Sequence, residues 1–117
     1  MDMNNTLTLW HTPRCSKSRA ALALLEDAGR APDVRLYLQT PPSEAELTAL
    51  LGKLSLSPRD LIRRGEKLYR DLSLKDADDA ALIVAMATHP ILIERPILIT
   101  ESAAVIGRPT EAIAALL

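Results

Sequence analysis

The spacing of hydrophobic residues in the first third of the chain changes from an alternating pattern to a helical one and back. Residues 6–10 alternate between polar and apolar side chains, which predicts a β-strand. From Ser16 the apolar positions recur at intervals of three and four, which predicts a helix that ends at Gly29. The apolar face of this helix comprises Ala21, Leu24, Leu25 and Ala28. Alternation returns over residues 34–38, so a strand, a helix and a parallel strand with a right-handed crossover are expected.

The next fifty residues carry the start and stop signals of helices. Residues 43–46 read Ser-Glu-Ala-Glu, which is a capping box, and leucines at helical spacing follow it. Pro58, placed just after Ser57, is typical of the first position of a second helix. A third helix is expected from Asp78 to about Thr88, ended by Pro90. The pattern therefore predicts three helices inserted after the second strand.

Short apolar runs return near the C-terminus. Residues 97–100 and 103–106 are separated by Glu-Ser, which predicts a β-hairpin although this pair is not a favoured turn. Pro109 is expected to start a final helix, whose apolar residues are Ile113, Leu116 and Leu117. We therefore expect residues 1–117 to form one α/β domain with a mixed sheet and a helical insertion between the second and third strands.

Composition excludes several classes of protein. The formal net charge of the 117 residues is -1, which provides no general attraction to nucleic acid or to an acidic membrane. No stretch approaches the roughly 20 apolar residues of a membrane span, and residues 1–5 lack the features of a secretory signal, so a cytoplasmic protein is expected. Asp76, Asp78 and Asp79 are expected to cap helices or to be solvated, because no further metal ligands lie at a defined spacing.

Cys15 is the only cysteine, and it lies where the first strand gives way to the first helix. The N–H groups at a helix start carry partial positive charge, and Arg14, Lys17 and Arg19 are close in sequence, so both effects favour a thiolate. The competing interpretation is a small buried apolar residue. Ser18 occupies the place of the second cysteine of a Cys-x-x-Cys pair, so any oxidised adduct of Cys15 has to be resolved by a thiol from another molecule.

Five segments of the chain resemble the glutaredoxin-coupled arsenate reductases, in particular the shorter chromosomal branch of that family. Residues 11–19 read His-Thr-Pro-Arg-Cys-Ser-Lys-Ser-Arg and are similar to the family pattern His-Asn-Pro-x-Cys-x-x-Ser-Arg. The other matching segments are residues 37–42, 61–63, 89–96 and 107–109. Thr12 stands in place of the family's Asn, and Ser16 and Lys17 in place of its usual Gly-Thr.

The resemblance implies a thioredoxin-like fold with a cis bond between Arg95 and Pro96. It implies that the Cys15 thiolate attacks arsenate, and that His11 and Ser18 assist ionisation of the thiol. The arginines at the family's oxyanion-binding positions are Arg63, Arg95 and Arg108. Glutathione as co-substrate and glutaredoxin as partner are also implied. We expect no bound cofactor, no metal and a monomeric protein.

Two other functions remain open from the sequence. A redox-sensing regulator that binds RNA polymerase has the same fold and a Cys-x-x-Ser segment, and a monothiol reductase would act on glutathione mixed disulfides. The pairing of Arg with Pro at residues 95–96 and 108–109 favours the oxyanion enzyme. The remaining arginines of the central region, Arg59, Arg64 and Arg70, are expected to be solvated.

Overall fold

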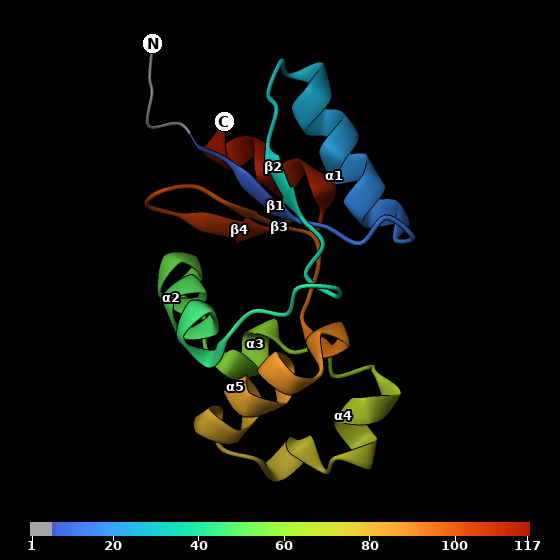
Figure 1. Cartoon of the computed structure of the whole chain (residues 1–117), viewed down its shortest axis with the longest axis vertical. Helices are drawn as coiled ribbons and strands as arrows, with labels where there is room; N and C mark the ends of the chain where they lie inside the picture. Colours follow the sequence, from blue (N-terminus) through green and yellow to red (C-terminus); the bar gives the residue numbers. More distant parts are fainter. Residues whose placement is uncertain (1–5) are drawn as a thin grey trace. The chain divides into compact units, whose positions relative to one another are not determined.

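Four short strands form one mixed sheet in the order β2-β1-β3-β4 (Figure 1). The computed structural model describes residues 6–117. Strand β1 (Thr8–Trp10) is parallel to β2 (Asp33–Arg35) and antiparallel to β3 (Ile97–Ile99), which pairs with β4 (Ala104–Ile106) as an antiparallel hairpin. The sheet belongs to a compact unit made of the chain up to Tyr37 and Arg95–Leu117.

Helix α1 (Ser16–Asp27) and the 3₁₀ helix η3 (Thr110–Leu116) share one hydrophobic core with the sheet. Leu9 and Leu98 are directly paired across β1 and β3, so their side chains lie on the same sheet face. The buried members of this core are Leu7, Leu9, Ala21, Leu25, Leu98 and Ile113. Gly29, with φ 74°, ends α1, and its N–H donates to the Glu26 carbonyl at 3.0 Å.

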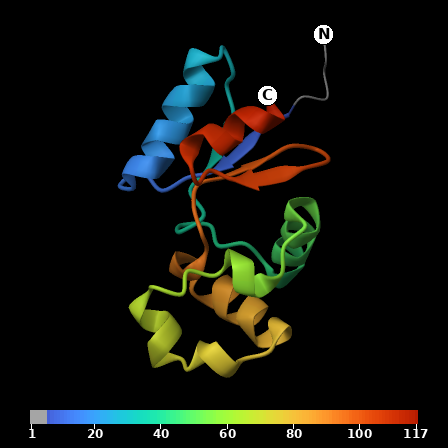
Figure 2. The ribbon, with the colours of Figure 1, turned by 180° about the vertical axis from the view of Figure 1, so that it is seen from behind.

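The second compact unit, Leu38–Glu94, is helical. Its elements are α2 (Glu44–Leu54), α3 (Pro58–Leu61), α4 (Lys67–Asp71), η1 (Leu74–Asp76), α5 (Asp79–Thr88) and η2 (Pro90–Leu92). The capping box before α2 is present, because the Ser43 side chain accepts the Glu46 N–H at 3.1 Å and the Glu46 side chain accepts the Ser43 N–H at 3.0 Å. Asp78 caps α5 by a single hydrogen bond, in which its side chain accepts the Ala81 N–H at 2.8 Å. Figure 2 shows the same elements from behind.

Most of the predicted elements are confirmed: the first strand and helix, the parallel β1–β2 pair, the three helix starts and the hairpin. The expected mixed sheet with a helical insertion between the second and third strands is confirmed too. The second strand is shorter than the alternation predicts, because β2 ends at Arg35 and Leu38 lies beyond it. Val34, in this edge strand, is 44% exposed, and Leu38 is 40% exposed. Ala28 was expected on the buried face of α1, but it is the exposed C-cap residue.

The C-terminal helix differs from its prediction in type. It is a 3₁₀ helix in which Ile113 is buried, and Leu117, which follows the helix, is 43% exposed. Helix α4 and the two short 3₁₀ helices η1 and η2 were not foreseen. The Arg95–Pro96 peptide bond is cis, as predicted, and so is Arg108–Pro109. Within residues 6–117 no helix is both long and apolar enough to cross a membrane.

Candidate active site

The loop between β1 and α1 places Cys15 at the residue immediately before the first helix, with extended backbone angles (φ -89°, ψ 123°). The Cys15 N–H donates to the Thr12 carbonyl at 2.9 Å, which closes a tight turn, and the Cys15 carbonyl accepts the N–H of Arg19 at 3.0 Å. At the other end of the loop, the His11 N–H donates to the Arg35 carbonyl of β2 at 2.9 Å. Backbone hydrogen bonds therefore hold the loop to both β2 and α1.

The surroundings of the Cys15 thiol favour its ionised form. Burial raises the pKa of Cys15, but the backbone N–H groups of Ser18 and Lys17 and the guanidinium of Arg95 outweigh this effect, so the pKa lies below its ordinary value. The first turn of the helix thus supplies two N–H donors to the sulfur. A half-exposed thiol with these neighbours does not fit the alternative of a buried apolar residue.

The cations nearest in sequence are not the source of this effect. Arg14 and Lys17 have exposed side chains. The Arg19 side chain instead donates from Nη1 to the Pro13 carbonyl at 2.9 Å, which ties α1 back to the loop. The charge that acts on the sulfur is that of Arg95, which is eighty residues further along the chain.

Ser18 and His11, the two residues expected to assist the thiol, are both buried. Ser18 is 0% exposed, and its Oγ accepts the Thr12 N–H at 3.3 Å, so its hydroxyl binds the loop itself. His11 is 6% exposed, and its Nδ1 has no hydrogen-bond partner among the described residues. Burial and the charge of Arg19 lower the pKa of His11, which therefore favours the neutral imidazole.

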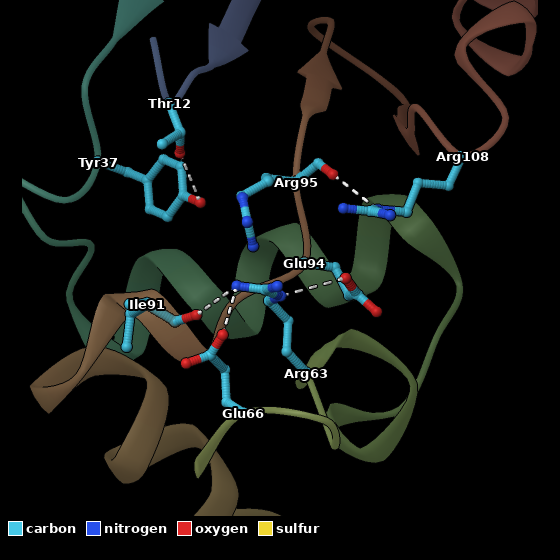
Figure 3. Close-up of polar contacts among 8 residues, drawn as sticks. All are labelled: Thr12, Tyr37, Arg63, Glu66, Ile91, Glu94, Arg95 and Arg108. Carbon is cyan, nitrogen blue, oxygen red and sulfur yellow. Dashed lines mark hydrogen bonds and ion pairs between the residues drawn. The ribbon is translucent and has the colours of Figure 1, made fainter. Parts of the chain in front are cut away.

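The Arg95 side chain hydrogen-bonds to Cys15, but two of its three nitrogens are unsatisfied among the described residues. Its Nε and Nη1 atoms are buried and have no hydrogen-bond partner in the part of the chain that the structure describes. The Arg95 carbonyl accepts a hydrogen bond from Nε of Arg108 at 2.9 Å, so these two arginines are directly connected (Figure 3). Burying guanidinium donors costs free energy unless an acceptor hydrogen-bonds to them, so Arg95 is well suited to bind an anion.

Arg63 belongs to the helical unit, and its guanidinium has acidic partners there (Figure 3). Nη1 of Arg63 lies 2.9 Å from Oε2 of Glu66 and 3.5 Å from the Ile91 carbonyl, and Nε lies 3.9 Å from Oε1 of Glu94. Of the predicted site residues, His11, Cys15, Ser18, Arg95 and Arg108 belong to the sheet-containing unit. The oxyanion-binding roles of Arg63 and Arg108 stay predictions from the resemblance.

Two residues with clear roles were missed by sequence reasoning. Tyr37 is almost fully buried, and its hydroxyl accepts a hydrogen bond from Oγ1 of Thr12 at 3.1 Å (Figure 3). The only signal for it was its place in one of the matching segments. Arg59, expected to be solvated, instead donates to Tyr69, Leu74 and Ala77 at 2.6–2.8 Å. No group of three or more His, Cys, Asp or Glu residues within residues 6–117 is arranged to hold a metal ion.

The topology and the position of the thiol define the class. A mixed sheet with one parallel pair and a cysteine at the start of the first helix characterise a thioredoxin-like protein. The chain belongs to the ArsC family, which it matches over residues 10–116.

Relatives and solved structures agree with this assignment. An arsenate reductase of Neisseria meningitidis serogroup B is 47% identical over 95% of this chain and 97% of its own. The structure of an arsenate reductase from Vibrio cholerae superimposes with a TM-score of 0.94 at 46% identity, covering 97% of this chain and 98% of that one. A putative arsenate reductase from Yersinia pestis gives a TM-score of 0.90 at 48% identity, covering 93% and 98% of the two chains.

Proposed function

We propose that this protein is an arsenate reductase whose nucleophile is the thiolate of Cys15. The observation that carries the proposal is the convergence on one sulfur of two helix N–H groups and the Arg95 guanidinium, which favour its ionised form. The names of the relatives supply the substrate class, since several of them are arsenate reductases. Arsenate is a tetrahedral oxyanion that suits the unsatisfied donors of Arg95.

In the first step the Cys15 sulfur forms a bond to arsenic, and one arsenate oxygen leaves as water after taking up protons. Arsenic remains pentavalent in this adduct. We assign Arg95 the stabilisation of the negative oxygens during the displacement, and we assign Arg108, whose Nε donates to the Arg95 carbonyl, the same task. We assign Arg63 the same kind of role on the family pattern alone, and His11 and Ser18 the roles of neutral neighbour and loop support.

Reduction then requires thiols from other molecules, because the chain has one cysteine. Glutathione replaces a second oxygen on arsenic, and that oxygen also leaves as water. A glutaredoxin thiolate next attacks the glutathione sulfur, and the electron pair of the sulfur–arsenic bond stays on arsenic, which becomes trivalent. The products are a glutathione–glutaredoxin mixed disulfide and, after water displaces Cys15, arsenite and the regenerated thiol. We expect the monomeric protein to act in the cytoplasm, where cysteines stay reduced and glutathione is available.

The test is arsenite production by the wild-type protein and by Cys15→Ser with glutathione, glutaredoxin, glutathione reductase and NADPH. We expect turnover by the wild type alone, and no turnover when glutathione is left out. Reduction of a glutathionylated peptide without arsenate turnover would instead identify a mixed-disulfide reductase. Binding to RNA polymerase without turnover of either substrate would identify a regulator.

A further inference from the structure

All three polar groups of Thr12 are engaged in hydrogen bonds. Its carbonyl accepts the Cys15 N–H at 2.9 Å, and its own N–H donates to the Ser18 Oγ at 3.3 Å. Its side-chain Oγ1 donates to the Tyr37 hydroxyl at 3.1 Å. Thr12 thus connects the residue that carries the thiol, the buried serine of α1 and a tyrosine 25 positions away.

Tyr37 is a rigid anchor for this connection. Its side chain is 1% exposed, and its ring stacks on the ring of Trp10 in β1, with centroids 6.0 Å apart and planes inclined by 23°. Trp10 is itself 3% exposed and has the Arg35 guanidinium 5.2 Å from its ring centroid. A phenol packed in this way cannot move its hydroxyl far, so the hydroxyl is a fixed point against which Thr12 is held.

The orientation of the Cys15 turn depends on Thr12, because the Thr12 carbonyl closes it. The helix N–H groups of Lys17 and Ser18 stabilise the thiolate only while the sulfur is aligned with them, since hydrogen bonds weaken steeply with misalignment. We propose that Tyr37 is a positioning residue for the Cys15 thiolate, acting through the side chain of Thr12. This inference rests on the proposed function, in which Cys15 is the nucleophile.

The experiment measures the pH dependence of Cys15 alkylation by iodoacetamide in the wild type and in Tyr37→Phe. Phenylalanine keeps the stacked ring and removes the hydroxyl. We expect the inflection to move to higher pH, with the rate constant below the inflection about two- to fivefold lower and the plateau at high pH unchanged. Tyr69→Phe is the matched control, because it removes the other tyrosine hydroxyl of the chain, which bonds to Arg59 in the helical unit, and we expect it to keep the wild-type inflection.

A second pair of variants tests the same step at Thr12. Thr12→Val removes the hydroxyl with little change in shape and is expected to reproduce the shift, whereas Thr12→Ser keeps a hydroxyl and is expected to restore the wild-type profile. A wild-type inflection in both Tyr37→Phe and Thr12→Val would overturn the proposal. Alkylation requires no arsenate, so a shifted inflection in a protein without arsenate turnover supports the positioning role and refutes only the proposed function.

Discussion

At the scale of single residues, Arg95 combines unsatisfied hydrogen-bond donors with a positive charge that acts on the thiol. Its Nε and Nη1 atoms are buried without hydrogen bonds among the described residues, and its charge acts on the Cys15 sulfur. An oxyanion bound there would satisfy the donors at the place where the thiolate attacks. The residue therefore links activation of the nucleophile to recognition of the substrate.

Replacement of Arg95 by glutamine should impair both of these steps. We expect kcat/KM for arsenate to fall about 100-fold or more, the usual cost of losing one donor to a developing oxyanion. The pH inflection of Cys15 alkylation should also rise, because a neighbouring positive charge is lost. Arg14→Gln is the matched control, since it removes an exposed arginine of the same loop. If both variants had the same kinetics, Arg95 would have no special role in the site.

His11 makes the stability of the fold depend on pH, and this dependence can be measured separately from activity. Burial, aided by the charge of Arg19, lowers the pKa of His11 below its ordinary value of 6.5. The unfolded chain therefore binds a proton at a higher pH than the folded chain does. This contribution to stability is fully present above pH 6.5 and is lost as the pH falls from there through the folded pKa.

Thermal unfolding of the wild type and of His11→Asn across this range tests the prediction. The difference between the two melting temperatures should be constant above pH 6.5, where His11 is neutral in both states, and should shift against the wild type on acidification. A difference in melting temperature that stays the same at every pH would show that the pKa of His11 does not change on folding.

At the scale of elements, the connection between β4 and η3 depends on the small size of Gly107. A Cβ placed there would lie 2.9 Å from Cδ1 of Ile113 and 2.9 Å from Cγ of Pro96. The Gly107 N–H also donates to the Pro96 carbonyl at 2.8 Å, so this backbone passes close to the cis-proline. The next residue is Arg108, whose Nε is bonded to the Arg95 carbonyl.

We expect Gly107→Ala to destabilise the protein by about 1–3 kcal/mol, the usual cost of forcing an extra group into a packed core. Arsenate turnover should fall as well, because the segment that carries Arg108 has to move. Gly65→Ala is the control, since a Cβ at Gly65 has nothing within 4 Å. Urea unfolding of both variants measures the difference, and equal stability would show that the core yields to the methyl group.

The elements that the sequence predicts well are those determined by neighbours along the chain. The caps at Ser43 and Asp78 and the stop at Gly29 involve residues within four positions of each other, and all three are present. Helix α4 was missed because it has no fully buried residue and therefore no apolar face to detect. The alternation around Val34 indicated a strand but could not show that the strand would lie at the edge of the sheet.

The candidate site shows the same division between local and distant contacts. The helix start at Cys15 could be predicted because it depends on the adjacent sequence. The action of Arg95 on the thiol and the bond from Thr12 to Tyr37 join residues far apart in the sequence, and only the resemblance indicated that these segments matter. The hydrogen bonds of Arg59 could not be predicted for the same reason, since its carbonyl partners lie 15 and 18 positions further along the chain.

At the scale of the whole molecule, the chain passes between its two compact units at Tyr37 and again at Arg95. These are the residues that we assign to positioning of the thiol and to recognition of the oxyanion. Both therefore lie at the points in the sequence where the chain leaves and re-enters the sheet-containing unit. The full sequence adds a single thiol, so no second cysteine exists to form a disulfide within the chain.

This count makes a definite prediction about the oxidised protein. Treatment with glutathione disulfide should add at most one glutathione per chain, on Cys15, because thiol exchange requires a cysteine. Intact mass measurement should show this adduct in the wild type and not in Cys15→Ser. Glutaredoxin with glutathione should remove the adduct and restore arsenate turnover, since the protein has no thiol of its own to displace it. An adduct that glutaredoxin cannot remove would contradict the proposed coupling, because the thiolate would then be inaccessible to the partner that has to complete the reduction.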